Sequence, residues 1–301
     1  MDWRRDGADW PNRAHSAFVK SDGITWHVQR MGNGPVLLLA HGTGAATHSW
    51  RDLMPALARH FTVIAPDLPG HGFTSAPPRY RLTLPDMAAA LQGLLAVLAA
   101  RPAVLVGHSA GAAILARLAL DGDTGARLLV SLNGALLPIT GLHGRIFSGT
   151  AKLLALMPAV PWFFAWRAGN LRAVTQLIES TGSRLDAAGM EYYRRLLSDP
   201  VHVSNVLAMM ANWEQEKLMQ DLPRLAPHLL LVAADGDHAV PPSVARDVAR
   251  FVPGAESRLQ AGLGHLSHEE APRETAAIIV EAYGRLAAPP RRGVCTPETA
   301  A

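Results

Sequence analysis

Residues 103–111 read AVLVGHSAG and join an apolar run to a segment rich in helix-forming residues. The run, residues 103–107, predicts a strand buried on both faces of a parallel sheet, and residues 110–120 predict a helix. Ser109 therefore stands in a strand-to-helix turn, inside a G-x-S-x-G pattern that raises its hydroxyl above the sheet edge. The N-terminus of the following helix favours negative charge that develops there. The pattern predicts a nucleophilic serine, and an ordinary glycine-rich turn is the structural alternative.

The same alternation of strand and helix extends in both directions from this turn. Two stretches of alternating polarity, residues 16–20 and 24–30, predict antiparallel edge strands. Apolar runs predict buried strands at residues 36–40, 61–66, 126–132 and 228–234, with a further strand-like segment at 256–260. Helices are predicted at residues 50–59, 84–100, 243–251 and 272–286. This order predicts an α/β fold with a doubly wound, mostly parallel sheet.

The alternation stops between residues 134 and 221, where helix-like segments replace strands. They are expected at residues 145–157, 171–180, 186–198 and 200–217. We expect this block to be an inserted helical lid over the carboxyl edge of the sheet. The predicted organisation is a core of residues 1–133 and 222–288, a lid of residues 134–221, and a disordered tail of residues 289–301.

A second glycine-rich loop, His41-Gly42-Thr43-Gly44, directly follows the predicted strand at residues 36–40. Acyl transfer requires two backbone N–H groups aimed at the developing oxyanion. We expect one from Ala110, the residue after the serine, and the other from Thr43, with Gly44 as the alternative. A glycine-rich turn without a catalytic role is the other interpretation of this loop.

The general base and its acid are expected late in the chain. His265 follows Gly264 on a loop at the sheet edge, and it is preferred over its neighbour His268 because glycines precede it. Asp237 follows the strand at residues 228–234 and is preferred as the acid over Asp235. The resulting order of serine, aspartate and histidine predicts a triad of Ser109, Asp237 and His265.

Several further side chains are candidates for a substrate pocket. His41, His108 and Trp50 lie in or next to the motifs above, and Trp162 and Trp166 belong to the aromatic stretch MPAVPWFFAW at residues 157–166. That stretch has three interpretations: packing of the lid on the core, a wide apolar pocket, or a patch for a membrane surface. The second interpretation implies a small-molecule apolar substrate, either large and flat or with an acyl chain, and a metal or cofactor is not expected.

Composition narrows the class of protein. The chain has 301 residues, of which 49% are hydrophobic and 18% charged, so it can build a large core. A formal net charge of +3 without a basic run argues against nucleic acid as a partner. The single cysteine excludes a disulfide within the chain. The N-terminal segment lacks an apolar signal core and no apolar run approaches the ~20 residues of a membrane span, so a cytoplasmic protein is expected.

The motifs together resemble the α/β-hydrolase superfamily, over most of the chain. The resemblance rests on the G-x-S-x-G pattern, the HGTG loop at residues 41–44, DLPGHG at residues 67–72 and Gly264-His265. Residues 10–13, 26–29 and 42–52 also resemble magnesium-chelatase accessory proteins of bacteriochlorophyll-making bacteria. That second resemblance implies a tetrapyrrole as ligand and an association with magnesium chelatase, without implying a particular substrate.

The predicted function is therefore a serine hydrolase acting on an ester-type bond. A nucleophilic aspartate, as in epoxide hydrolases of this fold, is disfavoured because the turn carries Ser109. The same triad also serves acyltransferases and cofactor-free peroxidases. A non-catalytic accessory protein that binds a tetrapyrrole is the alternative from a different class, because a fold alone does not assign a function.

Overall fold

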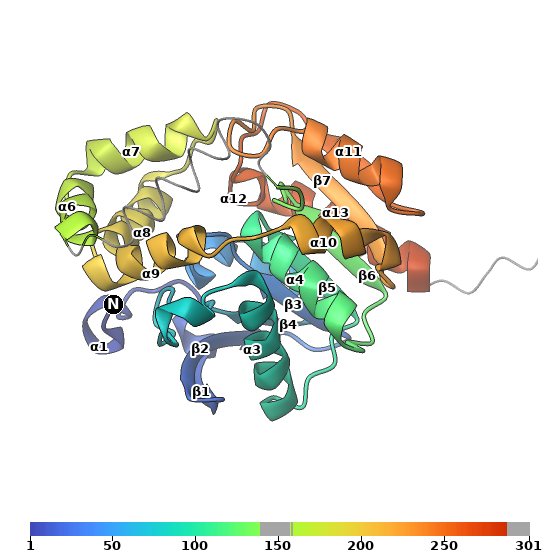
Figure 1. Cartoon of the computed structure of the whole chain (residues 1–301), viewed down its shortest axis with the longest axis horizontal. Coiled ribbons are helices and arrows are strands. Elements are labelled where there is room, and N and C mark those ends of the chain that lie inside the picture. Colours follow the sequence, from blue (N-terminus) through green and yellow to red (C-terminus); the bar gives the residue numbers. More distant parts are fainter. Residues whose placement is uncertain (139–156, 158, 288–301) are drawn as a thin grey trace, which may run out of the picture.

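The computed structural model describes residues 1–138, 157 and 159–287 and contains one eight-stranded sheet. The strands run in the order β1-β2-β4-β3-β5-β6-β7-β8 across the sheet (Figure 1). Their bounds are β1 Ser16–Ser21, β2 Ile24–Met31, β3 Val36–Ala40, β4 Thr62–Pro66, β5 Val104–His108, β6 Leu128–Leu132, β7 His228–Ala234 and β8 Glu256–Gln260.

The sheet is mostly parallel. Strand β2 pairs antiparallel with both β1 and β4, and every pairing from β4 to β8 is parallel. Strand β3 lies between β4 and β5, so the chain reverses its winding direction at this place. The carboxyl ends of β3 and β5 therefore form a topological switch point, where open α/β sheets bind ligands. The predicted doubly wound, mostly parallel sheet is confirmed.

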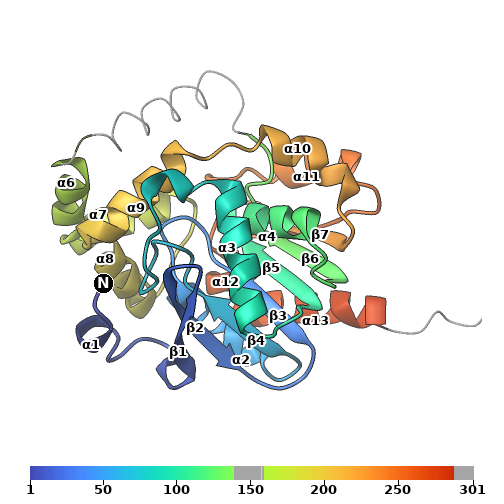
Figure 2. The same cartoon turned by 60° about the horizontal axis from the view of Figure 1, so that its bottom comes forward.

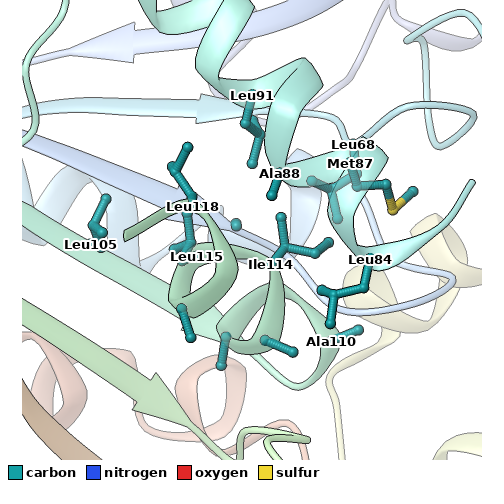
Figure 3. Packing of buried hydrophobic residues seen from close by; sticks show 14 of the residues in the cluster. Leu68, Leu84, Met87, Ala88, Leu91, Leu105, Ala110, Ile114, Leu115 and Leu118 are labelled. Carbon is teal, nitrogen blue, oxygen red and sulfur yellow. The ribbon is translucent and has the colours of Figure 1, made fainter. Parts of the chain in front are cut away.

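Helices cover both faces of the sheet, because alternate strand residues point to opposite sides. On one face, α3 (Leu84–Val97) and α4 (Ala110–Asp121) pack on Leu38, Leu105 and Leu129, and Figure 3 shows their leucine and alanine side chains meeting. On the other face, α2 (Leu53–Leu57) and α13 (Pro272–Ala287) pack on a second cluster of strand side chains. Helix α11 (Ser243–Phe251) lies against β7 and β8 at one edge.

The remaining elements are short. Helix α1 (Trp3–Asp6) lies near the start of the chain, and α12 (Ser267–Glu270) begins two residues after His265. Short 3-10 turns lie at η1 Arg13–His15, η2 Thr47–Trp50, η3 Arg79–Arg81 and η4 Leu222–Arg224. The helix predicted at residues 50–59 is therefore shorter, because η2 precedes α2.

Helices fill the described part of the chain between β6 and β7. They are α6 Ala159–Ala168, α7 Leu171–Ser180, α8 Ala187–Leu197, α9 Pro200–Ala211 and α10 Glu216–Asp221. The segment predicted as one helix at residues 200–217 breaks after α9, and α6 was not among the predicted helices. Pro161 is compatible with α6 because it stands in the first turn, where a missing N–H costs no helical bond.

The insertion gathers at one end of the molecule, where α6, α7, α8 and α9 lie together (Figures 1 and 2). The helix predicted at residues 145–157 lies, except for its last residue, outside the described residues, and so does the tail predicted at 289–301. Among the helices of the described residues, none is long and apolar enough to cross a membrane.

Candidate active site

Ser109 occupies a strained turn between β5 and α4. Its backbone has φ 50° and ψ −119°, a conformation that side-chain-bearing residues rarely adopt. The surrounding backbone holds it there: the Ser109 N–H donates to Leu132 O at 3.0 Å, and its carbonyl accepts from the N–H groups of Ala112 and Ala135. Strain that is over-determined in this way is characteristic of functional sites.

Two glycines allow this turn to be so tight. A Cβ on Gly107 would lie 2.4 Å from the backbone of Ala112, and a Cβ on Gly111 would lie 2.1 Å from the carbonyl oxygen of Ala40. Neither position has room for a methyl group, and both neighbours are backbone atoms that cannot swing aside. The glycines of the G-x-S-x-G pattern therefore let α4 pack directly against β5 and β3.

His265 is paired with a buried carboxylate. Its Nδ1 donates to Asp237 Oδ2 at 2.8 Å, and the Asp237 side chain is fully buried while that of His265 is 11% exposed. The other oxygen, Oδ1, accepts from the N–H groups of Ala239 and Val240, each at 2.8 Å. With its Nδ1 committed as a donor, the neutral imidazole presents Nε2 as a proton acceptor.

The histidine–aspartate pair lies beside the serine turn. The ring of His108, the residue before Ser109, is 4.7 Å from the ring of His265, and its Nε2 donates to the His265 carbonyl oxygen at 2.9 Å. Burial keeps the pKa of His108 well below its ordinary value, so this ring stays neutral. Within the described residues, no hydrogen bond joins the Ser109 hydroxyl to His265, and apo sites often tighten only when substrate binds.

The loop after β3 brings further backbone N–H groups to this edge. Among the hydrogen bonds of the described residues, none uses the N–H of Thr43 or of Ala110. A Cβ on Gly42 would lie 3.1 Å from Ser109 Cβ, so the loop passes directly over the serine. His41 is completely buried and fixes the loop, because its Nδ1 donates to Gly42 O and its Nε2 accepts from the Leu68 N–H.

The structure separates the paired residues from their sequence alternatives. Asp235 is exposed, and its carboxylate accepts from the Gly262 N–H rather than from an imidazole. His268 is completely buried, bonds Ser49 Oγ through Nε2 at 2.8 Å, and has a pKa lowered to about 3 by burial. Neither residue contacts the His265 imidazole through a hydrogen bond in the part of the chain that the structure describes.

The three tryptophans suggested for a pocket lie in different environments. Trp50 is completely buried in the core and stacks on His268, with ring centroids 4.7 Å apart. Trp162 and Trp166 lie on α6 and are 69% and 77% exposed. Within the part of the chain that the structure describes, no contact joins either tryptophan of α6 to the His265–Asp237 pair.

Two polar side chains that the sequence analysis did not single out support Asp237. Asn133, directly after β6, donates through Nδ2 to Asp237 Oδ2 at 2.8 Å, and its Oδ1 accepts from Ser267 Oγ at 2.8 Å. All three side chains are buried. The position of Asn133 at the carboxyl end of a strand next to β5 and β7 is the signal that could have identified it.

A second buried network lies behind the histidines. Glu269 accepts hydrogen bonds from Ser49 Oγ and from Tyr193 of α8, and it pairs with Arg51 at 3.0 Å. Burial raises the pKa of Glu269 to about 7. Because Ser49 also bonds His268, this network connects α8 of the insertion to α12, the helix that follows the His265 loop.

Comparisons with known proteins agree with this geometry at the level of the family. A family model described as the alpha/beta hydrolase fold matches residues 35–272. The chain is 42% identical over 283 residues to the magnesium-chelatase 30 kDa subunit of Rhodobacter capsulatus, covering 93% of this chain and 99% of that protein. It is 32% identical over 260 residues to a pyrrolizixenacetamide deacetylase of Xenorhabdus hominickii, covering 81% and 88%. The solved structure of epoxide hydrolase CorEH without ligand shares the fold, with a TM-score of 0.76 and 20% identity over 90% of this chain and 99% of that chain.

Proposed function

The chain belongs to the α/β-hydrolase fold family, in the group that contains the magnesium-chelatase 30 kDa subunit, and we propose that it is a serine hydrolase. In this proposal Ser109 is the nucleophile, His265 the general base, and Asp237 the acid that orients the base. The bond attacked is of ester type, in an apolar substrate of the small-molecule class. The observation that carries the proposal is the 2.8 Å bond from His265 Nδ1 to buried Asp237, beside a serine held at φ 50°.

The reaction would proceed in two stages. His265 Nε2 takes the proton of Ser109 Oγ as the oxygen attacks the carbonyl carbon, and the N–H groups of Thr43 and Ala110 stabilise the oxyanion. The tetrahedral intermediate collapses to an acyl-enzyme, and His265 returns its proton to the leaving group. Water then attacks the acyl carbon as His265 takes one of its protons, and His265 gives that proton to Ser109 Oγ when the acyl–oxygen bond breaks. Asp237 stays ionised throughout and stabilises the imidazolium form of His265.

The test is covalent labelling by a fluorescent fluorophosphonate, whose phosphorus captures an activated serine oxygen and loses fluoride. The wild-type protein is expected to be labelled and Ser109→Ala to be unlabelled. Ser180→Ala, which alters an exposed serine of α7, is the matched control and should be labelled like wild type. Labelling of Ser109→Ala, or absence of labelling in a folded wild-type protein, would overturn the assignment of the nucleophile.

A proposed interaction partner rests on the similarity to the magnesium-chelatase 30 kDa subunit and not on the geometry of the candidate active site. That relative is named as a subunit of magnesium chelatase, and 99% of its length matches this chain. We propose that this chain associates with magnesium chelatase and that its apolar ligand is a tetrapyrrole. Binding of protoporphyrin by fluorescence titration, and co-elution with the chelatase subunits, test the two parts.

The accessory alternative is separable from catalysis by the same variant. A non-catalytic carrier binds the tetrapyrrole and supports magnesium insertion equally well as wild type and as Ser109→Ala. An enzyme binds in both forms, but only wild type supports the pathway.

The serine hydrolase proposal also includes a cytoplasmic location and a lid function of residues 134–221. Contacts of the Thr181 carbonyl with the N–H groups of His238 and His265 support the lid function, because they connect the insertion to the base and acid loops.

A further inference from the structure

Helix α6 has an unusual outward face. Its buried positions are the small residues Pro161, Ala165 and Ala168, which pack toward the other helices of the insertion. Its outward positions carry four large aromatic side chains, and these are exposed by 41% to 77%: Trp162, Phe163, Phe164 and Trp166. These four side chains are called the aromatic face below. A helix on the surface of a globular protein normally shows charged and polar residues there.

The charged side chains nearest in sequence to the aromatic face are basic. Residues 157–178 contain no aspartate or glutamate, and their charged side chains are Arg167 and Arg172, both exposed. Helix α7, which packs beside α6, adds exposed Leu171 and Leu177 to the same end of the molecule. The first acidic residue after this segment is Glu179, exposed near the C-terminal end of α7, so the basic character is confined to α6 and the start of α7.

We propose that the aromatic face docks on an anionic lipid bilayer, with Arg167 and Arg172 contacting the headgroups. Tryptophan and phenylalanine prefer the headgroup–acyl boundary, and basic side chains add attraction to a negatively charged leaflet. A protein partner would need carboxylates to match the arginines, whereas a membrane supplies negative charge and apolar depth together. The helix binds at the surface and does not span the bilayer.

Docking would place the insertion between the membrane and the candidate active site. Helix α9, which packs on α6, bonds through His202 to the loop that carries Thr43, and the Thr181–Ser183 turn bonds the loop of His265. A molecule dissolved in the bilayer would therefore meet the part of the chain that adjoins Ser109. This inference rests on α6 and its charges and does not require that Ser109 be reactive.

The experiment is flotation of the full-length protein with vesicles of phosphatidylcholine alone or mixed with phosphatidylglycerol. Wild type is expected to float with the mixed vesicles. Trp162→Ala/Trp166→Ala should bind these vesicles at least about tenfold more weakly, because two large apolar surfaces are lost. Arg167→Gln/Arg172→Gln should weaken binding about fivefold per arginine at low salt, and less at high salt. Quenching of tryptophan fluorescence by brominated lipid should be seen in wild type.

Matched controls separate this proposal from general stickiness and from the proposed function. Leu259→Ala removes an apolar side chain on β8 that is 60% exposed, and Arg59→Gln/Arg246→Gln removes two exposed arginines elsewhere. Both should float like wild type, and so should Ser109→Ala. Absence of wild-type binding to mixed vesicles, or equal binding by the tryptophan variant, overturns the proposal. A concentration-dependent dimer that the tryptophan variant abolishes, without vesicle binding, would instead assign the face to a second copy of the chain.

Discussion

The Nε2 atom of His202, on α9, lies 3.2 Å from the carbonyl oxygen of Gly44 in the loop after β3. Its other ring nitrogen, Nδ1, accepts a hydrogen bond from the Gly72 N–H at 3.3 Å, so Nε2 carries the proton and donates to Gly44. Burial lowers the pKa of His202 to about 4, so the ring is uncharged at neutral pH and its two hydrogen bonds select this tautomer. One side chain of the insertion thereby fixes the loop that carries Thr43.

We expect His202→Ala to slow fluorophosphonate labelling of Ser109 about tenfold. The reason is that a misplaced Thr43 N–H would stabilise the transition state less well. The measurement is the second-order labelling rate at neutral pH. Val201→Ala, which alters the neighbouring exposed residue of α9, is the control and should label like wild type. An unchanged rate in a folded His202→Ala protein would mean that the loop keeps its geometry without α9.

The two aspartates at the end of β7 give a second prediction. Asp237→Asn should reduce the labelling rate on the order of 10⁴-fold, because an amide at this place favours the wrong histidine tautomer. Asp235→Asn should leave the rate near that of wild type, because the Asp235 carboxylate accepts from the Gly262 N–H and, among the described residues, does not bond His265. The reverse ranking would assign the acid to Asp235.

The strands and the serine turn were predictable because their signals are local. Apolar runs such as residues 36–40 predict buried strands, and the glycines around Ser109 indicate a tight turn. The choice of Asp237 over Asp235 had a weaker basis, since both follow the same strand and only the side-chain direction distinguishes them. Helix α6 escaped prediction because its aromatic outward face obscures the amphipathic period on which a helix prediction relies.

Other parts of the site depend on contacts between distant positions. Asn133 and Asp237 are 104 positions apart in the chain, and Tyr193 and Glu269 are 76 apart. No local pattern reports such a hydrogen bond, because it exists only after the sheet and the insertion have packed together. Placing Asn133 at the carboxyl end of β6 would have suggested a role but not a partner.

Asn133 itself supports a third prediction. Its φ of 47° is in the left-handed region, which asparagine adopts more readily than alanine, so Asn133→Ala loses the hydrogen bonds to Asp237 and Ser267 and also strains the backbone. Asn133→Gly loses the same two hydrogen bonds but adopts this φ without strain. Both variants should label more slowly than wild type, about tenfold, whereas only Asn133→Ala should lose about 1 kcal/mol or more of stability to strain. Urea unfolding and labelling rates, measured together, separate the two effects. Wild-type labelling by Asn133→Gly would show that Asp237 needs no support from this side chain.

Buried histidines and Glu269 make opposite contributions to stability as pH changes. Burial lowers the pKa values of His48, His71 and His108, so the folded state keeps them neutral while the unfolded chain takes up protons below about pH 6.5. Stability should therefore fall as pH decreases from about 6.5. This fall should be visible in urea midpoints measured from neutral to acidic pH.

Glu269 acts in the other direction, and a single variant isolates it. Because burial raises its pKa to about 7, the folded state holds a proton that the unfolded chain releases near its ordinary pKa of 4.5. This stabilisation is present below about pH 4.5 and is lost as pH rises through about 7. Glu269→Gln keeps a neutral side chain at every pH, so its stability relative to wild type should improve from pH 5 to pH 8, by up to about 3 kcal/mol. Urea unfolding of both proteins at the two pH values measures this difference. A constant difference would mean that Arg51, 3.0 Å away, keeps Glu269 ionised in the fold throughout that range.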